Sequence, residues 1–337
     1  MSEPLGSGRV LAPSPVGQVE PLASPPSFSV VIPAYQAAES IAAAVGSVLE
    51  QVRTASQVIV VDDGSTDGTV DALRPFRGEI ELIRKANGGA ASARNAGARA
   101  AHGDYVAVLD ADDSFHPRRI EALADLAMRR PDLDLITTDA RFVIEGREAG
   151  SFLRDNPFAT EDQRAAILRS CFVGGWPAVR RDRLLEIGGY DEGLRIGHDW
   201  DCWLRMILAG SSAGLVDRPY YDYTLHGSGL TASRTAALWD RVKLLEKAAE
   251  NPALRPRERP TLKYELRRRR NEAVEEETLA ALRSGGSRAR LLALAFRPGI
   301  SLRLRVAGVL AAPVPQLAGR LIRHGPTPEE RLAEGEP

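Results

Sequence analysis

Short apolar runs alternate with helix-compatible segments between residues 28 and 130, and this alternation is the feature that most restricts the fold. The apolar runs are FSVVIPAY (28–35), QVIVVDD (57–63), EIELIR (79–84), YVAVLD (105–110) and DLDLITTDA (132–140). Strands that are apolar throughout are buried on both faces, which requires helices to cover each side of the sheet. We therefore predict an α/β fold of Rossmann-like type, with a mostly parallel sheet flanked by helices.

Composition changes divide the chain into three predicted parts. Residues 1–26 are rich in Gly, Pro and Ser and lack a basic start followed by an apolar run, so we expect a disordered leader and no secretion signal. Residues 27–235 hold the α/β domain. Residues 236–337 are charged and helical in character, and we predict a helical extension with a disordered end.

The charge balance and the cysteines exclude several classes of function. The formal net charge is -1, so there is no global attraction to nucleic acid, and we expect no nucleic-acid partner. The two cysteines, Cys171 and Cys202, form neither a disulfide framework nor a zinc pattern. No stretch reaches the roughly 20 apolar residues that span a bilayer. We expect a cytoplasmic protein, with a peripheral position on the inner face of the cell membrane as an alternative.

An arginine-bearing stretch without acids, residues 287–324, is open to two interpretations. As an amphipathic basic segment, it would provide peripheral membrane contact through C-terminal Arg-rich helices. As a helical pair decorated with arginines, it would pack on the catalytic domain instead. Three prolines in the stretch interrupt any long helix and favour the second interpretation slightly.

The strongest chemical motif is DADD, residues 110–113, directly after an apolar run. Carboxylates crowded at a strand end repel one another, and a bound hard cation such as Mg²⁺ or Mn²⁺ relieves that repulsion while bridging to a diphosphate. Termination of the strand and capping of the next helix account for the same residues equally well. In parallel sheets ligands bind at this edge, where the strands have their carboxyl ends.

Two further motifs follow neighbouring strands. In VVDDGSTDGT, residues 60–69, a carboxylate at a strand end suits a base or a ribose hydroxyl, whereas a plain strand, turn and helix with local caps is the structural alternative. In NGGAASARNAG, residues 87–97, Gly89 permits close approach of a ligand and Arg94 offers a donor fork for phosphate or carboxylate. A small-residue helix packed on the sheet is the alternative there.

These motifs, with GGYDE (188–192) and HDWDCWLR (198–205), occur in one order that resembles the family 2 glycosyltransferases of GT-A fold over about residues 28–228. The resemblance implies a metal-dependent, inverting enzyme of hexosyltransferase type. It would move a sugar from a nucleotide-diphosphate donor, UDP being favoured, to a hydroxyl on a glycan or lipid-linked acceptor. Cell-envelope polysaccharide, lipopolysaccharide or glycolipid synthesis is the expected setting.

The resemblance also implies roles for individual residues. Those that would bind the nucleotide sugar are Pro33, Ala34, Tyr35, Asp63, Gly89, Arg94, Asp110, Ala111 and Asp112. Asp110 and Asp112 would form a DXD motif, with Asp112 and His226 as metal ligands and Asp110 and Asp113 as further candidates. Asp199 would be the catalytic base, with Asp201 as its fallback. This chain departs from the family at His198, where relatives carry an acid.

Acceptor contacts are expected from Gly175, Trp176 and Trp200, because an indole face suits stacking on a sugar. Burial of these tryptophans in the core is the alternative. Two other functions stay open: a catalytically silent protein that binds nucleotide sugars or glycans, and a nucleotidylyltransferase. The second would need a Gly-rich loop with a basic residue after the first strand, which PAYQAAES (33–40) does not provide.

Overall fold

The structure is a computed structural model that describes residues 8–15, 17–225 and 234–283, and the single residues 292, 296, 305, 306 and 309. The chain divides into two compact units, each described here by itself. The first comprises Met1–Gly227 with Glu250–Glu258, and the second comprises Ser228–Ala249 with Arg259–Pro337.

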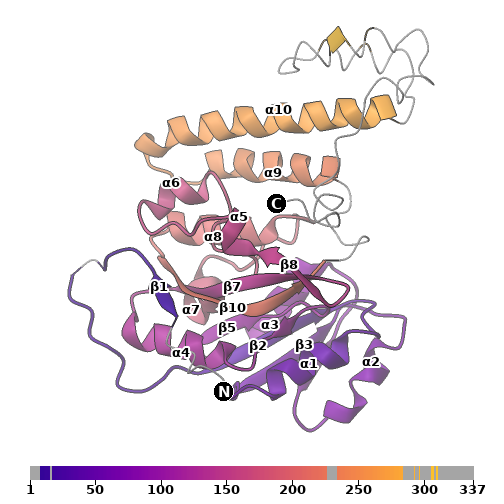
Figure 1. Cartoon of the computed structure of the whole chain (residues 1–337), viewed down its shortest axis with the longest axis vertical. Helices are drawn as coiled ribbons and strands as arrows, with labels where there is room; N and C mark the ends of the chain where they lie inside the picture. The colour runs from indigo at the N-terminus through magenta and orange to yellow at the C-terminus, as the bar shows by residue number, and fades with distance from the viewer. Residues whose placement is uncertain are drawn as a thin grey trace. The chain divides into compact units, whose positions relative to one another are not determined.

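The described strands of the first unit form one mixed sheet, in the order β1-β10-β7-β9-β5-β2-β3-β4, with β6 beside β10 and β8 beside β7 (Figure 1). Their bounds are β1 Arg9–Leu11, β2 Phe28–Ala34, β3 Gln57–Asp62, β4 Glu81–Arg84, β5 Tyr105–Val108, β6 Ser114–Phe115, β7 Leu135–Ile144, β8 Arg147–Ser151, β9 Ala178–Arg180 and β10 Ala213–Thr224. Strands β4, β3, β2 and β5 are parallel neighbours, as are β7 and β10, whereas β9 lies antiparallel between β5 and β7. The predicted α/β fold is confirmed.

The register of the parallel strands brings the carboxylate motifs to one edge. Ala34 at the end of β2 pairs with Asp62 at the end of β3, and Val31 pairs with Val108 at the end of β5. The chain therefore leaves β2, β3 and β5 on the same side of the sheet, and the acids that follow β3 and β5 lie along one edge of the sheet.

Helices cover both faces of this sheet. Those of the first unit are α1 Ile41–Leu49, α2 Thr69–Ala72, α3 Ala90–Ala100, α4 Arg119–Arg129, α5 Phe152–Asp155, α6 Gln163–Ile167, α7 Arg181–Glu186 and α8 His198–Leu208, with short 3₁₀ turns η1 Arg74–Phe76 and η2 Pro256–Glu258. Helices α1 and α4 share a core with Val30 and Ile32 of β2. Val31, on the opposite face of β2, meets α3 at Gly97, where an added Cβ would lie 2.3 Å from the valine Cγ1. Close packing explains why α3 is built from alanine and glycine.

Strand β10 was not predicted, because Asp217, Arg218 and Pro219 interrupt its apolar pattern. Its pairing with β7 shifts register on both sides of Pro219, and the strand continues beyond the irregularity to Thr224. Strand β1 corrects the expectation of a disordered leader in part. Arg9–Leu11 pairs antiparallel with β10, so a segment poor in core residues is held at the sheet edge by backbone hydrogen bonds.

The second unit is a helical pair, which the sequence predicted as an extension. Helix α9 (Arg234–Ala249) packs against α10 (Arg259–Arg283) through Leu238, Val242 and Ala273. The connection between them belongs to the first unit, where Glu258 accepts hydrogen bonds of 2.5 and 2.9 Å from Arg164. Within the described part of the chain, no helix has the length and apolar character needed to cross a membrane.

Candidate active site

The loops after β2 and β3 are joined to each other by side chains. Gln36 donates its backbone N–H to Ser65 Oγ at 3.1 Å, and its Oε1 accepts from the Thr66 N–H at 2.8 Å. Gly64, at φ +79°, lies close to the NGGAASARNAG motif. A Cβ added to Gly64 would be 2.9 Å from the Asn87 nitrogen. The VVDDGSTDGT motif therefore does more than cap a helix: it contacts both the loop after β2 and the start of the NGGAASARNAG motif. Tyr35, 53% exposed, stands in solvent beside it.

Asp63 fastens the loop that precedes α3. Its carboxylate is buried and accepts from Lys85 Nζ at 2.6 Å, from the Gly88 N–H at 3.0 Å and from the Gly89 N–H at 2.7 Å. The Gly88 N–H also lies 3.1 Å from Oδ2, so each carboxylate oxygen already has two donors within hydrogen-bond distance. The predicted contact of Asp63 with a base stays a prediction, and the visible role of this residue is to shape the loop.

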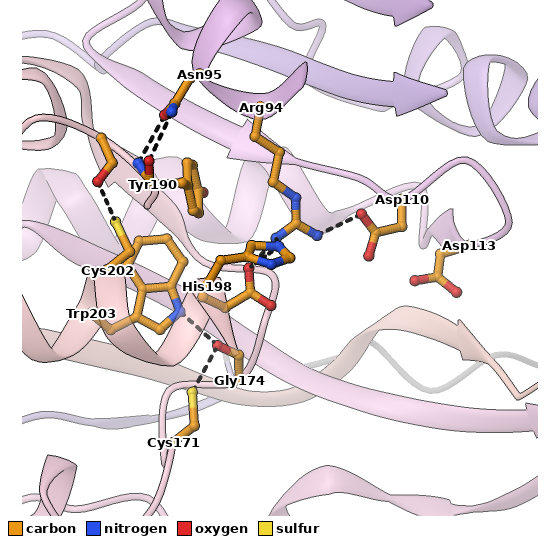
Figure 2. Close-up of polar contacts among 12 residues, drawn as sticks. Arg94, Asn95, Asp110, Asp113, Cys171, Gly174, Tyr190, His198, Cys202 and Trp203 are labelled. Atoms are coloured by element: carbon orange, nitrogen blue, oxygen red, sulfur yellow. Dashed lines mark hydrogen bonds and ion pairs between the residues drawn. The ribbon is translucent and has the colours of Figure 1, made fainter. Parts of the chain in front are cut away.

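Arg94 of α3 links acids from two distant parts of the chain (Figure 2). Its Nη2 donates to Asp110 Oδ1 at 2.7 Å, and its Nη1 forms an ion pair with Asp199 Oδ1. The arginine side chain is 4% exposed, whereas those of Asp110 and Asp199 are 36% and 25% exposed. A buried cation therefore holds two partly accessible carboxylates at the carboxyl edge of the parallel strands.

Electrostatics keep Arg94 charged and its neighbour His198 neutral. Burial alone would lower the pKa of Arg94, but the carboxylates of Asp110 and Asp199 outweigh burial and raise it above its ordinary value. Burial lowers the pKa of His198. Arginine can only donate, so His198 Nε2, 2.9 Å from Arg94 Nη1, must accept, which also requires the neutral ring. The charge of Arg94 is therefore shared between the two aspartates.

The four residues of the DADD motif differ in accessibility. Asp112 is exposed, Asp110 is partly exposed, and both Ala111 and Asp113 are buried. Asp113 accepts from the Tyr221 hydroxyl and from the Thr224 N–H, each at 2.7 Å, and burial, reinforced by Asp110 and Asp112, raises its pKa to about 8. Asp113 therefore ties the motif to β10, which disfavours it as a metal ligand and leaves Asp110 and Asp112 on the open side.

These two carboxylates fit a Mg²⁺ or Mn²⁺ ion, which takes oxygen ligands and commonly uses one or two carboxylates together with water and substrate phosphates. Within the described residues, no group of three or more His, Cys, Asp or Glu side chains is arranged to hold a metal by itself. His226, the other predicted ligand, lies outside the described residues. Any ion at this edge would therefore be bound by the two carboxylates together with oxygens of a bound diphosphate.

The two candidate bases occupy different environments on α8. Asp199 is partly accessible and faces Gly175, where an added Cβ would be 3.3 Å from Asp199 Oδ2. Asp201 is buried and accepts from Arg205 Nε at 2.7 Å. Arg205 in turn donates to the Ile187 and Gly189 carbonyls, so Asp201 supports the loop before α8. Accessibility favours Asp199 over its fallback.

The tryptophans expected to stack on an acceptor are buried instead. Trp176 is 5% exposed and donates its indole N–H to the Thr138 carbonyl at 3.0 Å, and Trp200 is 6% exposed and donates to the Ile167 carbonyl at 2.7 Å. Their indole faces are used in packing, which corrects the expected acceptor role. Gly175 alone of the three residues lies beside the candidate base.

Pro33 and Ala34, predicted to line a nucleotide pocket, end strand β2 at the same edge. Pro33 is partly exposed and Ala34 is buried. Ala34 accepts from the Asp63 N–H at 2.8 Å through its backbone carbonyl. These two residues therefore position the neighbouring Tyr35 and Asp63, and a direct contact with a nucleotide stays a prediction for both.

Asn95, for which the sequence indicated no role, fixes the approach of α8 (Figure 2). Its Oδ1 accepts from the Tyr190 N–H and its Nδ2 donates to the Tyr190 carbonyl, both at 2.8 Å. Gly189 is needed here, since at φ +73° an added Cβ would lie 2.4 Å from Asn95 Oδ1. Arg94 thus holds the acids of the active edge, and the adjacent Asn95 holds the GGYDE loop.

Replacing Asn95 with Ala is expected to destabilise the fold by about 2 to 4 kcal/mol, because the buried N–H and carbonyl of Tyr190 both lose their partner. Urea denaturation measures the effect. Asn95→Asp is the matched comparison: its buried carboxylate would face the Tyr190 carbonyl and the Glu192 carboxylate, to which Asn95 Nδ2 donates at 2.8 and 2.9 Å, so it should cost at least as much as Asn95→Ala at pH 7. Equal stability of Asn95→Ala and the parent chain would contradict this role.

Comparison with known proteins agrees with this arrangement. The profile of the family described as "Glycosyl transferase family 2" matches residues 29–188, which include β2, β3, α3 and the DADD motif. Residues 29–188 form a glycosyltransferase family 2 domain. The matched part ends before α8, so the family profile itself does not extend to Asp199.

Curated relatives share about a third of the aligned residues. The O-antigen biosynthesis protein RfbC of Myxococcus xanthus is 32% identical over 220 residues, covering 63% of this chain and 17% of RfbC. The succinoglycan biosynthesis protein ExoU of Rhizobium meliloti is 30% identical over 231 residues, covering 63% of this chain and 66% of ExoU. The chain thus spans less than two thirds of each of these family 2 relatives.

Solved structures share the GT-A fold. S. aureus TarS 1-349 in complex with UDP-GlcNAc has a TM-score of 0.62 at 17% identity, covering 87% of each chain. The mannosyltransferase PcManGT from Pyrobaculum calidifontis, in complex with GDP-Man and Mn²⁺, has a TM-score of 0.59 at 21% identity, covering 90% of each chain. At these sequence identities the similarity shows that this chain has the same fold, and no more than that.

Proposed function

We propose that the chain is an inverting glycosyltransferase that moves a sugar from a nucleotide-diphosphate donor to a hydroxyl acceptor. The observation that carries the proposal is the cluster of Asp199, Arg94 and Asp110. It joins a candidate base on α8 to the acidic motif after β5, at the edge where parallel sheets bind ligands. A base on one side of a sugar and a diphosphate site on the other are the two elements that inverting transfer needs.

The donor side is supported by the loops after β2 and β3. Tyr35 offers an exposed aromatic face on which a base can stack, next to the loop that Asp63 holds in shape. Solved structures of the same fold are complexes with UDP-GlcNAc and with GDP-Man, which supports a nucleotide sugar as the class of donor. We favour a UDP-sugar for this chain.

Asp110 and Asp112 would hold a divalent ion, Mg²⁺ or Mn²⁺, against the donor diphosphate. When bound, such an ion supplies Lewis-acid neutralisation of the charge that develops on the departing diphosphate. Arg94 contributes in the same region, because its buried guanidinium fixes the Asp110 carboxylate in one orientation. Asp113, anchored to β10, sets the position of the motif without binding the ion.

On the acceptor side, the free edge of the Asp199 carboxylate accepts the proton of the attacking hydroxyl as the new glycosidic bond forms. The ion pair with Arg94 holds this carboxylate beside the acidic motif after β5. Gly175 leaves space directly beside Asp199, since any larger residue would place a Cβ 3.3 Å from Oδ2. We assign this space to the acceptor hydroxyl, in place of the predicted stacking on tryptophan.

The biological setting follows from the relatives. Proteins named for the biosynthesis of O-antigen and succinoglycan, and a putative teichuronic acid glycosyltransferase of Bacillus subtilis, match this chain. We therefore propose a hexosyl transfer to a glycan or lipid-linked acceptor of the cell envelope, on the cytoplasmic side where nucleotide sugars are made.

Donor binding should depend on a divalent ion and on Asp112. A saturating UDP-sugar with Mg²⁺ or Mn²⁺ is expected to raise the melting temperature by about 5 °C, because a ligand at 100 times its Kd stabilises the fold by about 2.7 kcal/mol. The shift should vanish with EDTA and in Asp112→Asn. Differential scanning fluorimetry with UDP-, GDP-, dTDP- and CDP-sugars measures it.

Glu121→Gln is the matched control, since it removes an acid from α4 whose ion-pair partner among the described residues is the exposed Arg118, and which lies outside the motif. It should keep the full shift. A metal-independent shift, or an unchanged one in Asp112→Asn, would contradict the metal role. A shift without any turnover of donor, alone or with acceptors, would favour the alternative of a catalytically silent nucleotide-sugar-binding protein.

A further inference from the structure

A groove runs between the two helices of the second unit and is separate from the active edge. It has a volume of about 790 Å³, and most of its lining comes from one face of α10. The lining residues used in the argument are Trp239, Lys263, Tyr264, Arg267, Arg270 and Val274. Spacings of three and four residues place 263, 264, 267, 270 and 274 along a single helix stripe.

This stripe combines exposed aromatic surface with positive charge. Tyr264 is 55% exposed, and Trp239 lies opposite it on α9. Three cations line the groove, and none of the described lining residues is acidic. Arg270 pairs with Glu246 at 2.5 Å, both about half exposed, whereas Lys263 and Arg267 have no carboxylate partner among the described residues. A groove of this kind suits a ligand with an apolar body and an anionic head.

We propose that this groove docks the chain onto an anionic phospholipid surface. Tyrosine and tryptophan, each with an apolar ring and a polar tip, are enriched where lipid headgroups meet acyl chains. Lys263 and Arg267 would bind the lipid phosphates, while Trp239 and Tyr264 contact the acyl region. The chain's own residues 287–324 are unsuited to occupy this groove. They carry seven arginines and no acid, and would be repelled by the three cations of the lining.

The test uses the full chain and extruded vesicles, either pure phosphatidylcholine or phosphatidylcholine with 30% phosphatidylglycerol (about the anionic content that gives a strong surface potential). Each basic residue near an anionic surface contributes about a fivefold factor in affinity. Lys263→Gln with Arg267→Gln should therefore lower binding to anionic vesicles about 25-fold in flotation assays. Tyr264→Ser should weaken it at any salt concentration, because its contribution is apolar.

Arg241→Gln with Lys247→Gln is the matched control: both residues are exposed on α9, outside the groove lining, and the same charge is removed. Thermal unfolding confirms that each variant is folded. Equal loss of binding in control and groove variants, or no vesicle binding by the parent chain, overturns the proposal. So does a dimer in sedimentation that the groove variant dissociates, since the occupant is then a second copy. Donor-induced stabilisation is measured separately and does not depend on these outcomes.

Discussion

Replacing Asp199 with Asn is expected to lower kcat about a thousandfold while leaving donor binding within about twofold of the parent chain. General-base catalysis contributes about 10²- to 10⁴-fold, and asparagine has the shape of aspartate without a site for the proton. Donor hydrolysis provides a readout that needs no identified acceptor, because water takes the place of the attacking hydroxyl. Donor binding is followed by the same thermal shift that tests the metal site.

The comparison that makes this prediction specific is Asp201→Asn on the same helix. Asp201 is buried and supports the loop before α8 through Arg205, so its replacement should lower stability and leave the kcat of the folded protein within a few-fold. If Asp201→Asn abolishes turnover and Asp199→Asn does not, the base is the fallback residue. If neither reduces turnover, an aspartate base on α8 is wrong.

The parallel half of the fold could be predicted because its central strands β2, β3 and β5 are buried on both faces. Val30, Val31 and Ile32 of β2 are all inaccessible, and a short apolar run without a polar position is typical of a central strand. Strand β9 has three residues, within a Gly/Pro-bearing loop, and β10 contains a proline and three charged residues. Their pairing is decided by neighbours far along the chain, which local pattern does not encode.

The candidate site also has a part that the sequence predicts and a part that it does not. Sequence spacing marks Asp110, Asp112 and Asp199 as acids at element ends, which is where ligands bind in α/β folds. It does not reveal that Arg94 bridges two of them, because that contact requires α3 and α8 to meet at one edge. Sequence spacing also does not distinguish a tryptophan that stacks on a sugar from a tryptophan that packs in the core.

Trp176 illustrates why the sequence does not distinguish a sugar-stacking tryptophan from a core tryptophan. Its indole N–H finds the Thr138 carbonyl, 38 positions earlier in the chain, and its ring stacks on Tyr221 with centroids 5.1 Å apart. Fully buried Arg119 donates to the Trp176 carbonyl and lies over the same tyrosine ring. Each partner comes from a different element, so only the assembled sheet shows that the tryptophan is committed to the core.

The bridge formed by Arg94 should contribute strongly to stability, because one buried cation pairs with two carboxylates. Arg94→Gln is expected to lower the free energy of unfolding by about 3 kcal/mol, the lower end for removing one partner of a buried pair, because the two carboxylates are partly hydrated. Urea denaturation measures this change. Arg118→Gln, which removes an exposed pair with Glu121, should cost less than about 1 kcal/mol.

A double-mutant cycle separates the bridge from the volume of the arginine side chain. In an Asp199→Asn background, Arg94→Gln should cost about 1 to 2 kcal/mol less than in the parent chain, since one of the carboxylates that would lose its cation is already neutral. The coupling is a stability measurement, so it holds whether or not the donor has been identified. Strict additivity of the two substitutions would show that Arg94 and Asp199 are merely adjacent. In that case the base would have to be oriented by the packing of α8 alone, and the link between the acidic motif and the acceptor side would be lost.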